Sequence, residues 1–211
     1  DPHHDVLFLQ HTSGTTGVPK AAVHTNYQMV RNVVAIVNAC HGTEDDVYLG
    51  HLPFFHLFGR VCSLNAALFS GARCVLQRTF QPAESLRLIA EHGVTIQHAA
   101  PAHLILEMNV ANFSEYDFGT LRSGFVAGAV CPVDTFKRAC ELMQCRYLGS
   151  WGCSEAFEGL VSDYDNDSLE LRATTAGKPF EGFEFKVIDE AGKSLPPGQA
   201  DELCVRSYAV L

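Results

Sequence analysis

Short apolar segments alternate with longer segments of helical character through most of this 211-residue chain. Segments typical of β-strands lie at residues 6–9, 46–52, 73–76, 94–99, 121–127 and 145–148. Helical spacing of apolar residues, or helix boundary residues, mark residues 25–39, 58–70, 82–92, 101–110 and 133–143. Strands that alternate with helices form a largely parallel β-sheet covered by helices, so the sequence predicts an α/β fold.

The pattern changes after about residue 175. Residues 184–189 and 202–206 are typical of strands, and turn-forming sequences at 190–193 and 196–198 lie between them. Such spacing is typical of an antiparallel meander. We therefore expect an α/β subdomain over residues 1–175 and the beginning of a β-rich subdomain, cut short, over residues 176–211.

Charge and hydropathy exclude several classes of protein. The net charge is −9 and no run of basic residues occurs, which argues against a nucleic-acid partner. No apolar stretch reaches the roughly 20 residues that cross a bilayer, and the polar first five residues carry no secretion signal. We expect a cytoplasmic protein. The first predicted strand begins almost at residue 1, which suggests a piece of a longer protein.

The eight cysteines and ten histidines form no metal-binding pattern. No Cys-x-x-Cys pair occurs, and most of the cysteines lie inside apolar segments. A disulfide framework is typical of small secreted domains. We therefore expect buried free thiols in a reducing compartment.

Residues 12–20 form the most distinctive loop of the chain, with the sequence Thr-Ser-Gly-Thr-Thr-Gly-Val-Pro-Lys. Backbone N–H groups of such a loop can surround a phosphate, hydroxyl groups add donors, and Lys20 adds a positive charge. The loop lacks the Gly-Lys-Ser/Thr order of conventional nucleoside triphosphatases, because Pro19 precedes Lys20 and Ala21 follows it. The alternative is a flexible connector rich in small polar residues.

Three further segments are predicted to follow strands and to precede helices. They are residues 53–59 (Pro-Phe-Phe-His-Leu-Phe-Gly), 127–132 (Ala-Gly-Ala-Val-Cys-Pro) and 150–155 (Ser-Trp-Gly-Cys-Ser-Glu). In open α/β sheets, ligands bind at the carboxyl ends of the strands. We therefore expect these segments to gather at one edge of the sheet, together with the loop at 12–20.

Together the four segments resemble the signature motifs of the adenylate-forming superfamily, which includes acyl-CoA synthetases, aryl-CoA ligases, luciferases and the adenylation domains of peptide synthetases. Residues 9–20 fit the first motif (apolar, two free positions, Thr-Ser-Gly-Thr-Thr-Gly-x-Pro-Lys) at every fixed position, and the others follow in the family order. Residues 177–179 and 201–206 resemble the passage into the family's β-rich subdomain. The resemblance covers essentially the whole chain and is greatest to carboxylic acid–CoA ligases.

The resemblance implies a two-step reaction that uses ATP, Mg²⁺ and coenzyme A. A carboxylate attacks the α-phosphorus of ATP to give an acyl-adenylate and pyrophosphate, and a thiol then takes the acyl group. Such chemistry depends on positioning and charge stabilisation. The nucleotide-binding residues that the resemblance implies are Thr12, Ser13, Gly14, Thr15, Thr16, Gly17, Lys20, Ala129, Ser150, Trp151, Gly152 and Ser154.

The resemblance also implies an acid pocket and three catalytic residues. The implied pocket residues are His56, Phe58, Val126, Gly128, Trp151 and Gly152. Lys20 would bind phosphate, His56 would lie beside the carboxylate and the α-phosphate, and Glu155 would bind Mg²⁺. Outside this context, His56 and Trp151 are typical core residues and Glu155 is a typical solvated acid.

The chain departs from the family pattern at a few positions. Ala21 stands where most relatives have glycine, Asn26 where many have histidine, and Asp201 where glycine is usual. The ribose-binding aspartate, the hinge residue and the C-terminal lysine of the family have no counterpart in residues 1–211. We therefore expect the 211-residue chain by itself to bind nucleotide weakly and to turn over little.

The sequence thus predicts the activation of a fatty, alicyclic or aromatic carboxylic acid by an AMP-forming acyl-CoA ligase. Residues 1–175 would carry the nucleotide and acid sites. The expected partners are the acid, ATP and coenzyme A, with a homodimer as a further hypothesis. Alternatives are an adenylation domain that loads a carrier protein and a noncatalytic nucleotide-binding module.

Overall fold

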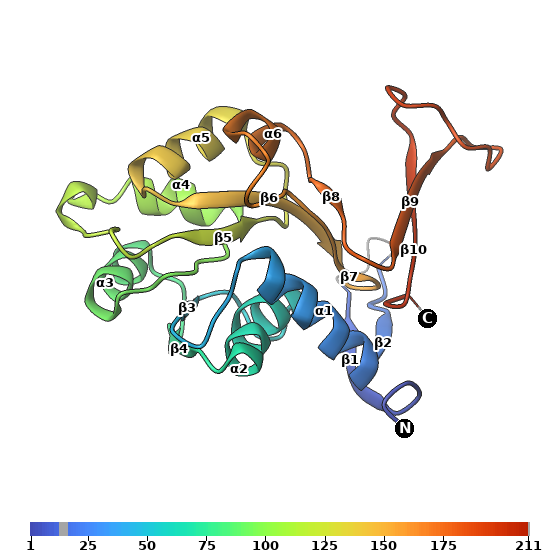
Figure 1. Ribbon diagram of the computed structural model, residues 1–211, viewed down its shortest axis with the longest axis horizontal. Helices are drawn as coiled ribbons and strands as arrows, with labels where there is room; N and C mark the ends of the chain where they lie inside the picture. Colours follow the sequence, from blue (N-terminus) through green and yellow to red (C-terminus); the bar gives the residue numbers. More distant parts are fainter. Residues whose placement is uncertain (13–16, 211) are drawn as a thin grey trace.

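The centre of the protein is a parallel β-sheet, seen in a computed structural model that describes residues 1–12 and 17–210 (Figure 1). Strand β3 (Val47–Gly50) pairs with β4 (Arg73–Leu76), and β5 (Ser123–Val126) pairs with β6 (Arg146–Cys153). Residues 94–99 lie between the two pairs. They join β3 through Tyr48 and Ile96 and join β5 through Ala99 and Val126, always in parallel orientation. The predicted parallel core is therefore confirmed.

The sheet continues beyond β6 in the opposite sense. The second half of β6 pairs with β7 (Phe157–Val161) in antiparallel register, and β7 pairs with the two-residue strand β8 (Lys178–Pro179). The predicted strand at residues 145–148 is shorter than β6, and the sequence predicts neither β7 and β8 nor the short helix α6 (Leu169–Thr174). The strand is longer than predicted because Ser150, Gly152 and Cys153 pair as strand residues although their composition is typical of a turn.

Helices cover both faces of the parallel sheet (Figure 1). One face is covered by α1 (Asn26–Ala39), the π-helix η1 (Phe58–Asn65) and α2 (Ala66–Ser70). The other face is covered by α3 (Pro82–His92), α4 (Pro101–Met108) and α5 (Val133–Leu142). A single turn of 3₁₀ helix, η2 (Phe113–Glu115), follows α4. This layering is the α/β architecture that the sequence predicts.

Successive side chains of β3 point to opposite faces of the sheet and pack into two different hydrophobic cores. Tyr48 is fully buried and packs with Val33 and Ile36 of α1, whereas Val47 and Leu49 point to the face covered by α3. Side chains on a strand alternate between the two faces of a sheet, so a continuous apolar run is needed when both faces are covered. Burial of one such large apolar side chain contributes about 1.5–3 kcal/mol.

The helix boundaries follow recognisable capping chemistry. Thr25 caps α1, where its hydroxyl accepts a hydrogen bond from the Gln28 N–H and the Gln28 side chain accepts one from the Thr25 N–H. The helix ends at Ala39, the last residue of the predicted range, with Cys40 as its C-cap. Gly71 and Gly93 follow α2 and α3 as C-caps in the left-handed conformation.

The N-terminal strand is not a buried strand of the parallel sheet, contrary to the prediction for residues 6–9. Strand β1 (Val6–His11) forms an antiparallel hairpin with β2 (Ala21–Thr25), and the side chains of Val6 and Leu9 remain more than half exposed. An apolar run without polar alternation predicts burial on both faces. The partner strand is short and carries a histidine, so it gave no signal of its own.

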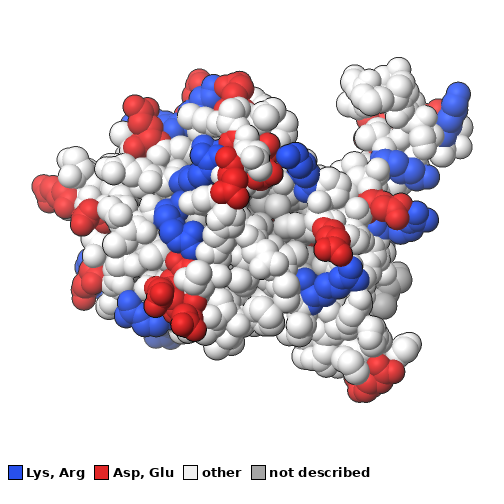
Figure 2. Space-filling model, in the orientation of Figure 1, with Lys and Arg blue, Asp and Glu red and all other residues white. Residues whose placement is uncertain are grey.

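The C-terminal strands form the antiparallel pair that the sequence predicts. Strand β9 (Phe183–Ile188) pairs with β10 (Glu202–Ser207), and the hairpin projects from the body of the molecule (Figure 1). Acidic and basic side chains are interspersed over the face shown in Figure 2. Within the described part of the chain, no helix combines the length and the apolar character needed to cross a membrane.

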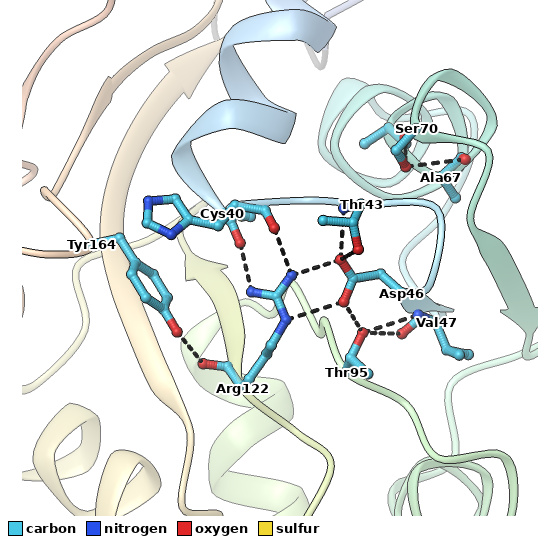
Figure 3. Close-up of polar contacts among 11 residues, drawn as sticks. Cys40, Thr43, Asp46, Val47, Ala67, Ser70, Thr95, Arg122 and Tyr164 are labelled. Carbon is cyan, nitrogen blue, oxygen red and sulfur yellow. Dashed lines mark hydrogen bonds and ion pairs between the residues drawn. The ribbon is translucent and has the colours of Figure 1, made fainter.

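An ion pair between the buried Asp46 and the partly exposed Arg122 ties the amino ends of the central strands to the residues that follow helix α1 (Figure 3). The guanidinium of Arg122 donates to both carboxylate oxygens of Asp46, at 3.1 and 2.6 Å, and to the carbonyl oxygens of Cys40 and His41. Asp46 also accepts a bond of 2.6 Å from the hydroxyl of Thr95. Burial by itself would raise the pKa of Asp46, but the hydrogen bonds from Arg122 and Thr95 outweigh it and the pKa is lowered.

Replacing Arg122 by methionine is expected to lower the free energy of unfolding by about 2–4 kcal/mol at pH 7, because the carboxylate of Asp46 would stay buried without its partner. The lowered pKa of Asp46 stabilises the fold above about pH 4, and this contribution disappears as the pH falls through the folded-state pKa. The effect of Arg122→Met should therefore shrink in acid. Urea unfolding of the complete protein, followed by Trp151 fluorescence, measures it.

The exposed pair between Arg206 and Glu184 provides the control. Arg206→Met should change the unfolding free energy little at any pH, because exposed ion pairs contribute little. An Arg122→Met protein as stable as the wild type at pH 7 would show that the pair does not hold the strands.

Candidate active site

The carboxyl ends of the parallel strands carry two of the four predicted segments where the sequence placed them. Residues 53–59 follow β3 and lead into η1, and residues 127–132 follow β5 and lead into α5. The other two positions were wrong in detail. Residues 12–20 connect the strands of an antiparallel hairpin, and residues 150–155 belong partly to β6 and lead to β7. Described residues of all four segments nevertheless line cavities at the same edge, with Thr12 representing the segment 12–20.

Two adjoining cavities lie at this edge. The first, here called the His56 cavity, has a volume of about 370 Å³. The predicted site residues that line it are Thr12, His56, Phe58, Gly128, Gly152, Ser154 and Glu155. The second, here called the Trp151 cavity, has a volume of about 490 Å³. The predicted residues that line it are Val126, Gly128, Ala129, Ser150, Trp151 and Gly152.

Gly128 and Gly152 line both cavities, so the two spaces adjoin. Of the remaining predicted residues, Gly17 and Lys20 are exposed and line neither cavity. The backbone of Lys20 lies opposite Thr12, whose N–H donates to the Lys20 carbonyl at 2.8 Å. Ser13, Gly14, Thr15 and Thr16 lie outside the described residues.

Polar contacts hold the N-terminal hairpin against this edge. The ring of His24 on β2 lies 2.8 Å from the carbonyl oxygen of Ser154, with Nε2 facing it. Burial lowers the pKa of His24 despite the bond to Ser154, so the ring is neutral near pH 7 and its Nε2–H donates to the carbonyl. On β1, the side chain of Gln10 donates to the Phe55 carbonyl and accepts a bond of 2.6 Å from Arg60.

These contacts place Thr12 and Glu155 in one cavity, although Thr12 follows β1 and Glu155 lies in the turn between β6 and β7. The sequence analysis missed His24, Gln10 and Arg60. A lone histidine or glutamine inside a strand is most often a satisfied core residue, and nothing in the sequence pairs these residues across more than 40 positions.

His56 stands at the rim of its cavity with a defined tautomer. Its Nδ1 accepts a hydrogen bond of 3.1 Å from the Phe58 N–H, and partial burial lowers the pKa of the imidazole. A neutral ring whose Nδ1 accepts must carry its proton on Nε2. His56 can therefore donate one hydrogen bond to an oxygen atom in the cavity.

Trp151 both packs against a neighbouring aromatic ring and lines a cavity. Its indole packs edge-on against Phe185 of β9, with ring centroids 5.7 Å apart, and the residue also lines the Trp151 cavity. A flat apolar ring at a cavity wall suits an aromatic ligand. Because Phe185 of the C-terminal hairpin supports the indole, this wall of the Trp151 cavity depends on the hairpin as well as on β6.

The cavity wall between β6 and β7 requires a glycine. A Cβ atom on Gly152 would lie 2.5 Å from the Phe157 carbonyl oxygen and 2.7 Å from Oε2 of Glu158. Both distances are shorter than a non-bonded contact allows. Gly128 differs, since a Cβ there meets nothing within 4 Å but the backbone has a φ of +84°.

Glu158 and Asn32 are cavity residues that the sequence analysis missed. Glu158 is only 7% exposed and lines the His56 cavity, and burial raises its pKa to about 7 against a smaller opposing influence of Ser150. Asn32 of α1 is fully buried and donates to the backbone carbonyl of Glu158 at 2.7 Å. Glu158 follows Glu155 by three positions, and its sequence position alone does not show on which side of the loop it points.

Within residues 1–12 and 17–210, no three His, Cys, Asp or Glu side chains converge to hold a metal ion. Mg²⁺ commonly takes one or two protein carboxylates and completes its shell with water and phosphate oxygens. The exposed carboxylate of Glu155, next to Ser154 and Thr12, fits that requirement. All eight cysteines are free thiols, and burial raises the pKa of the Cys40 thiol to about 12, so this group stays protonated and inert.

The arrangement of sheet and helices is shared with solved structures of adenylate-forming enzymes. Two of them are ATP-bound MatB from Rhodopseudomonas palustris, with 25% identity and a TM-score of 0.87, and the anthranilate CoA ligase AuaEII in complex with anthranoyl-AMP, with 26% identity and a TM-score of 0.90. They match 98% and 99% of this chain, which covers 40% of each.

The sequence model described as AMP-binding enzyme matches residues 1–211, and the chain therefore belongs to this family. It is similar to the acyl-CoA ligase sidI of Aspergillus fumigatus (34% identical over 206 residues, 97% of this chain) and to a long-chain-fatty-acid–CoA ligase of Bacillus subtilis (30% identical over 218 residues, 100% of this chain). The chain spans 35% and 38% of the lengths of these two relatives.

Replacing Gly152 by alanine is expected to force β6 and β7 apart, because the methyl group has no space beside the Phe157 carbonyl. The free energy of unfolding should fall by about 1–3 kcal/mol, and ligand binding at both cavities should weaken. Denaturant unfolding and nucleotide titration of the complete protein measure the two effects.

Gly119→Ala is the matched control, because a Cβ at Gly119 meets only the side chain of Asp117, at 3.1 Å. This variant should resemble the wild type. Equal behaviour of Gly152→Ala and Gly119→Ala would mean that the close approach at Gly152 is unimportant.

Proposed function

We propose that this chain carries the adenylation site of an enzyme that activates a carboxylic acid with ATP and transfers the acyl group to coenzyme A. The observation that supports this most is the convergence of Thr12, His56 and Glu155 on the His56 cavity, next to the Trp151 cavity. The relatives named above include CoA ligases and an ATP-bound structure, which agrees with the proposal. The acid is of the fatty, alicyclic or aromatic class.

The Trp151 cavity would receive the adenosine part of ATP. Trp151 offers a ring for stacking on adenine, and Ala129, Ser150 and Gly152 offer backbone or hydroxyl contacts. Residues 12–20 would bind the phosphates through N–H and hydroxyl donors, with Lys20 as the positive charge. Ser154 adds a hydroxyl next to Glu155.

The His56 cavity would hold the acid. His56 would donate from Nε2 to the carboxylate and keep its oxygen in line with the α-phosphorus. An acyl–phosphate bond then forms as the bond to pyrophosphate breaks, and the thiol later displaces AMP at the carbonyl carbon. When bound, Mg²⁺ supplies charge neutralisation on the phosphates, and Glu155 is the residue that would hold it.

We further propose a division near residue 175, with both sites in residues 1–175 and a β-rich subdomain that begins at 176. The reducing cytoplasm suits eight free thiols. A carrier protein is the alternative acyl acceptor. Thioester formation by the complete protein, with coenzyme A or a phosphopantetheinyl carrier as the only thiol, separates the two acceptors.

Lys20→Ala and Glu155→Ala should each reduce acid-dependent ATP–pyrophosphate exchange by about 10²–10³-fold, as the loss of one charge-stabilising group does in other enzymes. The assay uses the complete protein and a panel of fatty, alicyclic and aromatic acids. Lys193→Ala and Glu190→Ala, which remove exposed charges from the turn between β9 and β10, are the matched controls and should leave exchange unchanged.

Two results would count against the proposal. Exchange that persists at the wild-type rate in both Lys20→Ala and Glu155→Ala would remove their assigned roles. ATP binding without exchange for any acid would favour a noncatalytic nucleotide-binding module instead.

A further inference from the structure

The buried carboxylate of Glu158 is the polar group of the site that the proposed reaction leaves without a task. The residue is 7% exposed and lines the His56 cavity. In the described part of the chain, its Oε1 atom is buried and has no hydrogen-bond partner. The hydroxyl of Ser150 on β6 lies near enough to oppose the rise in the pKa of Glu158, but it too is buried without a hydrogen-bond partner in the described structure. A carboxyl oxygen can accept two hydrogen bonds, so a bond from Ser150 would still leave one position open.

An unsatisfied buried carboxyl group is costly. Leaving a buried polar group without a partner costs about 1–3 kcal/mol, and more when it carries a charge. The other deeply buried glutamate of the chain, Glu107, avoids this cost because Gln97 donates to both of its oxygens, at 2.9 and 3.0 Å. Glu158 therefore has an unfilled bonding position on the wall of a ligand cavity.

The place of Glu158 in the cavity tells which part of a ligand it meets. His56 is exposed at the rim, whereas Glu158 and Asn32 lie at the buried side of the same cavity. The apolar residues Phe58, Val61 and Cys62 line this cavity as well. A ligand that places its carboxylate at His56 thus points its far end along an apolar wall toward Glu158.

The charges near Glu158 leave the bonding position to the ligand. The thiol of Cys62 on η1 lines the same cavity, and burial raises its pKa and keeps it protonated. Asn32 is occupied with the Glu158 backbone. Neither α1 nor η1 brings a cationic side chain to the described wall of the cavity.

We propose that Glu158 selects a carboxylic acid that bears a hydrogen-bond donor, a hydroxyl or an amino group, at the end remote from the reacting carboxylate. This inference rests on the proposed adenylation function. A ligand hydroxyl or ammonium group would occupy the free Oε1 atom and remove the cost of burying it. An unsubstituted fatty or aromatic acid of the same length would bring a methyl or C–H group against the carboxyl group and leave that atom unpaired.

Sets of three acids of equal length test the proposal. Each set contains one acid with a terminal methyl group, one with a terminal hydroxyl and one with a terminal amine, over short and medium chain lengths. Pyrophosphate exchange by the complete protein should give a kcat/KM about 10- to 100-fold higher for the acid with a terminal hydroxyl or amine than for the acid with a terminal methyl group. The difference should lie mainly in KM.

Two substitutions carry the test further. Glu158→Leu should reverse the preference toward the methyl acid, because the donor would then face an apolar side chain. Glu158→Gln keeps the size of the side chain. It should lower activity toward the acid with a terminal amine much more than activity toward the acid with a terminal hydroxyl. Glu107→Gln is the matched control, a buried glutamate in the other core, and should leave every ratio unchanged.

The outcomes separate the two proposals. A wild-type preference for the methyl acid, or ratios that Glu158→Leu and Glu158→Gln leave unchanged, would overturn the role of Glu158 while leaving adenylation intact. The absence of exchange with every acid, in a protein that is folded by circular dichroism, would overturn the proposed function and this inference with it. If Glu158→Leu does not fold, the isosteric Glu158→Gln and the wild-type ratios decide the question.

Discussion

The hydrogen-bonded pair of Asp46 and Arg122 fixes the common starting point of the central strands. Asp46 precedes β3, Thr95 begins the segment at 94–99, and Arg122 precedes β5, so one network joins the amino ends of three neighbours (Figure 3). A buried ion pair is stabilising only when its hydrogen bonds are complete, and here Cys40 and His41 complete them with backbone carbonyls. Because the strands share this origin and run in parallel, their carboxyl ends reach the opposite edge together, and the two cavities lie there.

The cavities combine segments with different mechanical support. Residues 53–59 and 127–132 extend directly from the sheet, so their positions follow from the core. The hairpin of β1 and β2 is instead held by three polar bonds, between Gln10 and Phe55, Gln10 and Arg60, and His24 and Ser154, and by the packing of a few rings against Phe157. Polar bonds of this kind contribute about 0.5–1.5 kcal/mol each, far less than a buried core. The position of Thr12 relative to Glu155 is therefore the part of the site with the weakest support.

Periodicity was enough to predict the parallel core and its covering helices, because apolar spacing reports directly on burial. It failed for residues 6–9, where an apolar run lies in an exposed hairpin, and for β7, whose sequence includes Glu158 and Gly159. Of the residues that the motifs indicate, His56, Trp151 and Glu155 line the cavities, whereas Gly17 and Lys20 line neither, and the roles of all five stay predictions. They could not reveal His24, Asn32 or Glu158, because a side chain acquires such a role only when a segment distant in the sequence packs against it.

Glu107 and Glu158 show how the same chemistry has different consequences at two places in one fold. Burial raises the pKa of both, to about 8 and about 7 respectively. Glu107 lies in the core between α3, α4 and α5, where Gln97 satisfies both oxygens and the group is complete. Glu158 lies where the backbone at Gly152 approaches so closely that a Cβ atom would touch its carboxyl group, which leaves the side chain no room to turn away on that side. The close packing of β6 on β7 therefore holds an incompletely bonded acid at a ligand cavity, and such a local departure from hydrogen-bond satisfaction is typical of a functional site rather than of a core.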